Sequence, residues 1–127
     1  MTMPSVQFDF SGQTAVVSGG TRGIGAAISR KLLDAGATVW ATYSTNKEQA
    51  AAFRQSADDA AERLHCVAFD VADYAACEGF FAQLDASCDR LDILVCNAGI
   101  RRDAAVAMMP VDDWRRVVDI NLSGTFH

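Results

Sequence analysis

The sequence of 127 residues lacks several features that would place it in other classes of protein. It has no excess of positive charge, since 11 Lys and Arg stand against 16 Asp and Glu and give a net charge of −5. Nucleic-acid binding needs a basic face, so no nucleic-acid partner is expected. No apolar run approaches the ~20 residues that cross a bilayer, so no membrane partner is expected either. The first ten residues lack the charged and apolar regions of a secretory signal.

Residues that commonly bind metals are few. The four cysteines are Cys66, Cys77, Cys88 and Cys96. None forms a CxxC pair, and only His65 and His127 could add imidazole ligands, so no metal site is expected. Cys66 and Cys96 lie in apolar runs, where a cysteine usually behaves as a small hydrophobic residue. We therefore expect reduced thiols in a cytoplasmic protein.

Prolines are rare too, and the chain instead alternates between two apolar patterns. Continuous apolar runs at residues 14–18, 38–43, 64–71 and 91–99 predict buried strands. Helices are predicted from Gly23, over residues 46–61 with a soft end near Asp58, from about Tyr74 and from Asp112. Such alternation specifies a parallel sheet with right-handed crossovers. The predicted fold class is α/β, a Rossmann-type doubly wound parallel sheet. Residues 1–127 would form one domain holding the first four strands and their helices.

The apolar positions of the helices predict their buried faces. Ile24, Ile28 and Leu32 recur every four residues as one stripe, and Gly36 is a suitable C-terminal stop. The inner face of the third helix is predicted to carry Tyr74, Cys77, Phe80, Phe81 and Leu84. From Asp112, the spacing of Trp114, Val117, Val118 and Leu122 predicts that a last helix is present, without assigning it a buried face.

A glycine cluster, SGGTRGIG, follows the first predicted strand at residues 18–25. Gly19, Gly23 and Gly25 have the spacing GxxxGxG at a strand-to-helix turn. A turn without side chains lets the backbone approach a pyrophosphate, and the helix offers free N–H groups at its positive end. A glycine turn can also join a strand to a helix without any ligand. A Walker A loop is excluded because Ala26 follows the spacer, and a GxGxxG fingerprint because Ile28 occupies its third glycine position.

Four motifs in order resemble those of the short-chain dehydrogenases/reductases along the whole chain. They are the glycine loop with Ser18 in place of the usual threonine, Asp70-Val71 after the third strand, CNAG at 96–99 and Asn121 in DINLSGTF. The resemblance implies a Rossmann fold, a nicotinamide cofactor and an asparagine of the catalytic tetrad at Asn121. Asn121 could also be an ordinary helix residue bonded to backbone. The predicted cofactor contacts are Gly19, Thr21, Arg22, Gly23, Ile24, Gly25, Tyr43, Ser44, Thr45, Asp70, Val71, Asn97, Ala98 and Gly99.

The end of the second strand favours NADP(H) as the cofactor. An acidic residue at this point accepts hydrogen bonds from the adenosine ribose of NAD, but residues 43–46 are all uncharged. No carboxylate would therefore repel a 2′-phosphate, and Arg22 in the glycine loop offers a guanidinium suited to phosphate. Lys47 is either a second positive charge for that phosphate or a solvated residue of the first helical turn.

The spacing of Tyr43 and Lys47 is that of a catalytic tyrosine–lysine pair, yet both lie at the adenosine end of the predicted site. The family resemblance implies a tyrosine acid whose pKa a lysine lowers, and a serine that holds the carbonyl. These three residues normally follow the fourth helix. Tyr74 has Glu78 at the lysine position, so it is no substitute. Only Asn121 of the four catalytic residues has a counterpart.

We therefore expect the 127 residues to be a piece of a reductase about twice as long. Four strands of a doubly wound sheet would leave the edge beyond the fourth strand unpaired, with Leu94 exposed. A homo-oligomer, or a second chain that completes the sheet, is the expected assembly.

Within the family, residues 97–126 look most like the 3-oxoacyl thioester reductases, which act on acyl-carrier-protein or CoA substrates. This resemblance implies NADPH-dependent reduction of a 3-oxoacyl thioester, with the chain supplying the cofactor-binding half. Arg101 and Arg102 could meet an acidic carrier protein or CoA phosphates, or be solvated. The alternatives are a non-catalytic NADP-binding module that senses the cofactor or regulates a partner, and an NAD-linked alcohol dehydrogenase of the same fold.

Overall fold

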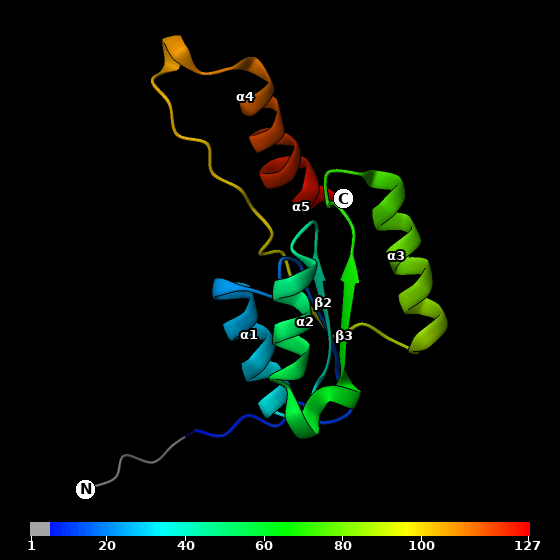
Figure 1. Cartoon of the computed structure of the whole chain (residues 1–127). Coiled ribbons are helices and arrows are strands. Elements are labelled where there is room, and N and C mark those ends of the chain that lie inside the picture. The colour runs from blue at the N-terminus through cyan, green and yellow to red at the C-terminus, as the bar shows by residue number, and fades with distance from the viewer. Residues whose placement is uncertain (1–5) are drawn as a thin grey trace, which may run out of the picture.

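The computed structural model describes residues 6–127 (Figure 1). Strands and helices alternate as predicted, in the order β1 (Thr14–Val17), α1 (Gly23–Asp34), β2 (Thr38–Tyr43), α2 (Lys47–Gln55), β3 (Leu64–Ala68), α3 (Tyr74–Ser87) and β4 (Ile93–Val95). Short 3₁₀ turns, η1 (Asp58–Arg63) and η2 (Val106–Met108), precede β3 and follow β4. The chain then continues as α4 (Val111–Val118), the π-helical segment η3 (Asp119–Ser123) and α5 (Gly124–Phe126).

The four strands form one parallel sheet in the order β3-β2-β1-β4. In its centre, Ala15 of β1 is opposite Val39 of β2 on one side and Ile93 of β4 on the other. The strand order therefore reverses between β1 and β4, and all carboxyl ends meet at one edge of the sheet. In open α/β sheets, ligands bind outside that edge at the point of reversal. The prediction of a Rossmann-type parallel sheet is confirmed.

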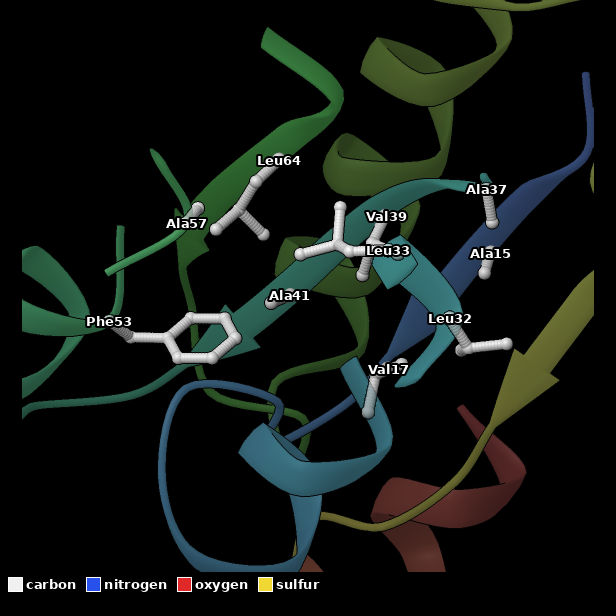
Figure 2. Close-up of a cluster of buried hydrophobic side chains, with 10 residues drawn as sticks. All are labelled: Ala15, Val17, Leu32, Leu33, Ala37, Val39, Ala41, Phe53, Ala57 and Leu64. Carbon is white, nitrogen blue, oxygen red and sulfur yellow. The ribbon is translucent and has the colours of Figure 1, made fainter. Parts of the chain in front are cut away.

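Helices cover both faces of the sheet, with α1 and α2 on one side and α3 on the other (Figure 1). The first face is packed by Leu32, Leu33 and Phe53 against alternate residues of β1 and β2, as Figure 2 shows. The second face is packed by Phe80 and Leu84 of α3 against Val16 and Trp40. Burial of both faces explains why the strands are apolar without interruption. Figure 2 draws ten residues of the first cluster: Ala15, Val17, Leu32, Leu33, Ala37, Val39, Ala41, Phe53, Ala57 and Leu64.

The predicted apolar stripe of α1 is wrong at its first position. Ile24 is 76% exposed, whereas Leu32 and Leu33 further along the helix are buried. The first turn of α1 packs through Gly25 against the backbone of the glycine loop, so its neighbour Ile24 points away from the sheet. Tyr74, predicted on the inner face of α3, is likewise 52% exposed, while the rest of the predicted face holds the buried residues Cys77, Phe80 and Leu84.

Three predicted elements are markedly shorter in the structure. The helix predicted over residues 46–61 stops at Gln55, and Asp58 has a φ of +46°, which an α-helix cannot contain. Arg63 then donates hydrogen bonds to the carbonyls of Leu33 (3.0 Å) and Ala37 (2.7 Å), which ties η1 to the end of α1. The third strand ends at Ala68, before a turn in which Asp73 N–H bonds to the Asp70 carbonyl. The fourth spans Ile93–Val95 only.

The segment 111–127 forms a helical arm that stands over the carboxyl ends of the strands (Figure 1). The helix predicted from Asp112 is confirmed, beginning one residue earlier. In this arm, Trp114 is 61% exposed and Leu122 is 69% exposed. Leu94, on the outer edge of β4, is 53% exposed, as predicted for an edge strand. No helix within residues 6–127 is both long and apolar enough to cross a membrane.

Candidate cofactor site

A cavity of about 520 Å³ lies outside the carboxyl ends of β1, β2 and β4, at the strand reversal. Its walls come from the loops that follow all four strands, so residues far apart in the sequence meet there. Most of the predicted cofactor residues line it: Gly19, Thr21, Arg22, Gly23, Ile24, Gly25, Tyr43, Ser44, Thr45, Val71, Asn97, Ala98 and Gly99. Two predicted site residues, Asp70 and Asn121, do not line it. The role of each residue toward a cofactor stays a prediction.

The glycine loop has a conformation that side chains would prevent. Gly19 and Gly23 have φ angles of +63° and +53°, in the left-handed region that favours glycine. A methyl group at Gly25 would lie 2.0 Å from the Gly19 carbonyl oxygen and 2.5 Å from Asn97 Nδ2. The loop therefore folds back on the first turn of α1 only because Gly25 has no side chain.

The loops after β1 and β4 are joined through Ser18 and Asn97. Asn97 Nδ2 donates to the carbonyls of Ser18 (3.0 Å) and Gly19 (3.1 Å). In return, Ser18 Oγ accepts from the backbone N–H groups of Asn97 and Ala98, each at 3.0 Å. These bonds close the gap between the two strands at the reversal point and fix the floor of the cavity. In the sequence, Ser18 was notable only as a replacement for threonine, so this joining role was missed.

A second missed residue, Ser29, anchors the glycine loop from below. Its side chain is fully buried, and its Oγ donates to the Gly20 carbonyl at 2.9 Å. Ser29 lies one turn beyond Gly25 on the buried face of α1. The only signal in the sequence was a polar residue at a helical position facing the sheet.

The cavity lining is polar after β2 and includes one positively charged residue, Arg22. Arg22 is the N-cap residue of α1 and is exposed, and none of the ion pairs among residues 6–127 includes it. Because no side chain caps α1, its first N–H groups face the loop unpaired by a cap. Asn46 caps α2 by accepting from Gln49 N–H at 3.0 Å. Lys47 lies outside this cavity, beside Glu48 in a neighbouring hollow.

Asp70 is held beside the cavity by two donors. Its Oδ1 accepts from Ala72 N–H at 2.9 Å, and its Oδ2 pairs with the guanidinium of Arg116 in α4. Partial burial acts to raise the pKa of Asp70, but the Ala72 N–H and Arg116 stabilise the carboxylate and leave its pKa below the ordinary 3.8. Val71, the next residue, does line the cavity.

Asn121 lies in the π-helical segment, and its side chain forms hydrogen bonds with backbone groups. Its Oδ1 accepts from Ile100 N–H at 2.8 Å, and its Nδ2 donates to the Ile100 carbonyl at 2.9 Å. Thr125 Oγ1 donates to the Asn121 carbonyl at 3.2 Å. The amide therefore fixes the segment just after Gly99, which is the bonding to backbone considered as an alternative to catalysis. A catalytic role for Asn121 stays a prediction.

Further residues line the cavity that the motifs did not single out: Asn46, Gln49, Phe69, Ile100 and Ile120. Most lie within three residues of a predicted contact, so their position after a strand end was the available signal. Within residues 6–127, no group of three or more His, Cys, Asp or Glu side chains is placed to hold a metal ion.

The site has the features that a dinucleotide needs. A crevice at the strand reversal, a glycine turn that a single methyl group would block, and an open helix N-terminus are those of pyrophosphate binding in Rossmann folds. Fold and site together place the chain among the Rossmann-type α/β proteins.

Comparison with known proteins narrows that class. The family described as short chain dehydrogenase matches residues 13–127. The chain is 41% identical over 115 residues to the acetoacetyl-CoA reductase of Paracoccus denitrificans, covering 91% of this chain and 46% of that protein. It is 35% identical over 121 residues to a 3-oxoacyl-[acyl-carrier-protein] reductase of Aquifex aeolicus, covering 95% and 49%. A blue fluorescent protein from a metagenomic library, solved in complex with NADPH, is 34% identical with a TM-score of 0.84, covering 93% and 49%.

The chain therefore belongs to the short-chain dehydrogenase family. It spans about half the length of the relatives that it matches.

Proposed function

We propose that this chain is the cofactor-binding half of an enzyme that reduces a 3-oxoacyl thioester to the 3-hydroxyacyl thioester with NADPH. The acyl group would be linked to CoA or to an acyl-carrier protein. The observation that carries the proposal is the glycine-lined cavity at the strand reversal, with Arg22 and no carboxylate at the end of β2. The names of the reductases from Paracoccus and Aquifex support the substrate class.

The residues of the cavity fit the parts of a dinucleotide. The backbone of Gly19–Gly25 and the N-terminus of α1 would hold the pyrophosphate, since they present N–H groups and no side chains. Val71 and the loop after β2 would hold the adenosine, and the loop of Asn97–Gly99 would lie along the nicotinamide half. NADPH supplies a hydride when it is bound.

Selection of NADPH over NADH would come from charge at the adenosine end. A 2′-phosphate carries negative charge, which a carboxylate after β2 would repel and a guanidinium would attract. Tyr43, Ser44 and Thr45 carry no charge, and Arg22 is exposed and lines the same cavity. Both facts favour the phosphorylated cofactor.

Turnover would need groups that residues 1–127 do not supply. The family resemblance implies a serine, a tyrosine and a lysine, none of which has a counterpart here, so the reduction is proposed for the whole enzyme. Asn121 would act by holding the segment at Ile100 in place, because both polar atoms of its side-chain amide are bonded to that residue. That same engagement supports the second candidate, a non-catalytic NADP-binding module.

The proposal is tested by adding acetoacetyl-CoA and measuring the oxidation of NADPH from the loss of NADPH absorbance. The whole enzyme should consume NADPH in proportion to the 3-hydroxyacyl product and should consume NADH at least tenfold more slowly. Tight binding of NADPH without any turnover of 3-oxoacyl thioesters would favour the binding module. Faster turnover with NADH would instead favour an NAD-linked dehydrogenase.

A further inference from the structure

The helical arm of residues 111–127 contacts the loop between β3 and α3, residues 69–73, at three points. Arg116 forms an ion pair with Asp70. Gly124 lies against Val71 so closely that a methyl group on it would come within 2.6 Å of Val71 Cγ2. His127 Nδ1 lies 2.8 Å from the Val71 carbonyl oxygen, at hydrogen-bond distance. The arm is thus docked on the loop that forms one wall of the cavity.

The same arm also holds the opposite wall of the cavity. Asn121 bonds to both backbone groups of Ile100, and Ile120 is buried and lines the cavity. Phe69 and Val71 form part of the first wall, on the side proposed for the adenosine. One helical arm therefore bridges two walls that belong to loops after different strands.

Arg116 is the charged link in this bridge. Among the residues described, its pair with Asp70 is the only ion pair between the arm and the 69–73 loop. The Asp70 carboxylate is already oriented by Ala72 N–H, so Arg116 meets a fixed partner. Its neighbour Arg115 pairs with Asp112 inside α4, 3.6 Å away, and bridges nothing.

We propose that Arg116 is a positioning residue for cofactor binding, which holds the two walls of the cavity at a fixed separation through Asp70 before the dinucleotide enters. The inference rests on the proposed function of the site. A wall that is ordered in advance costs no further conformational entropy when the ligand binds, so its loss weakens binding without removing a ligand contact. The link would act on both halves of the dinucleotide, because the arm reaches both walls.

Equilibrium binding to the full protein tests the proposal with two probes, NADPH and reduced nicotinamide mononucleotide, which has no adenosine. We expect Arg116→Ala to raise the dissociation constant of NADPH roughly tenfold and to raise that of the mononucleotide as well. In an Asp70→Asn background, Arg116→Ala should have no added effect on either constant. Arg115→Ala is the matched control and should change either constant less than about twofold. Unchanged NADPH binding in Arg116→Ala, or additive effects of the two substitutions, would overturn the proposal. So would a loss confined to NADPH, which would make Arg116 a local adenosine contact.

Amide hydrogen exchange in the ligand-free protein separates this inference from the proposed function. The Ile100 N–H donates to Asn121, so it should exchange faster in Arg116→Ala than in the wild type or in Arg115→Ala. Arg116→Lys keeps the charge with a different geometry, so its Ile100 exchange rate should lie between those of the wild type and Arg116→Ala. It serves as the test variant if Arg116→Ala folds poorly. If the wild type binds neither nicotinamide nucleotide, the proposed function fails, while the exchange rate still decides the role of Arg116. Unchanged exchange at Ile100 would refute the bridge.

Discussion

Single residues decide whether the cavity can exist, and Gly25 is the clearest case. Its position was predicted because the spacing of three glycines after a strand has few other uses. The mechanical reason, that a Cβ at residue 25 would lie 2.0 Å from the Gly19 carbonyl oxygen, is visible only in the folded structure. The pairing of Asp70 with Arg116 could not be predicted at all, because 46 residues separate the two in the sequence. Sequence patterns report neighbours along a helix or strand, not across a fold.

Gly25→Ala should destabilise the protein by roughly 1–3 kcal/mol, because the new methyl group meets backbone that cannot move aside. It should also weaken NADPH binding more than tenfold, since the glycine loop must shift. Gly79→Ala is the control: it lies in α3 with open space around it, so it should be neutral or stabilising by up to about 1 kcal/mol. Urea unfolding and NADPH titration measure both effects. Equal behaviour of the two variants would contradict the account.

His65 should make stability depend on pH in a defined window. Burial, with a smaller effect of Arg54, lowers the pKa of His65 below the ordinary 6.5, and its ring stacks on Trp40 with centroids 4.4 Å apart. The unfolded chain then binds more protons than the native one between the native pKa and 6.5, so stability falls as the pH drops through that window. Denaturant unfolding of the wild type and of His65→Phe from pH 5 to 8 measures this. The difference between their unfolding free energies should change as the pH falls, because only the wild type loses the stability linked to His65. A parallel pair of curves would be inconsistent with this assignment.

At the scale of elements, apolar periodicity predicted every strand and helix of the sheet, but not where each one ends. β2 spans the predicted residues because its apolar run is bounded on both sides. β3 and β4 stop early where Asp70 and Asn97 bond to nearby or distant backbone instead of continuing the ladder. Side chains that compete for backbone in this way are visible in a sequence only as residue types, without partners.

The joint between the loops after β1 and β4 should behave as one unit. Ser18→Ala and Asn97→Ala each remove bonds to partly buried backbone, so each should cost about 1–2 kcal/mol. Because they share the same joint, the double variant should cost less than the sum, with a coupling of roughly 0.5–1.5 kcal/mol. A double-mutant cycle by urea unfolding measures this coupling. Strict additivity would mean that the two loops are held independently.

For the whole molecule, the open feature is the outer edge of β4 and the apolar surface near it. Leu94 is 53% exposed, and β4 has one partner strand among residues 6–127. Unpaired strand edges with apolar residues associate readily. The predicted homo-oligomer, or a second chain that completes the sheet, would cover this edge.

We expect the 127-residue chain alone to self-associate through this edge. Leu94→Lys should weaken dimerisation, lowering the association constant at least about threefold, because the lysine charge must be desolvated when two edges pair. Val106→Lys, at a position 94% exposed and away from β4, is the control and should have little effect. Sedimentation velocity over a range of concentrations measures both. Association that Leu94→Lys leaves unchanged would place the contact elsewhere.

The most direct test of the account is calorimetric titration of the protein with NADPH and with NADH. We predict one site per chain, an affinity for NADPH at least tenfold higher than for NADH, and loss of that preference in Arg22→Ala. Arg90→Ala, which removes a charge paired with Asp92 just before β4, should keep the preference. The claim that this cavity is an NADPH site would be contradicted if the wild type bound neither cofactor. It would also be contradicted if the ratio of the NADPH and NADH affinities were the same in the wild type and in Arg22→Ala.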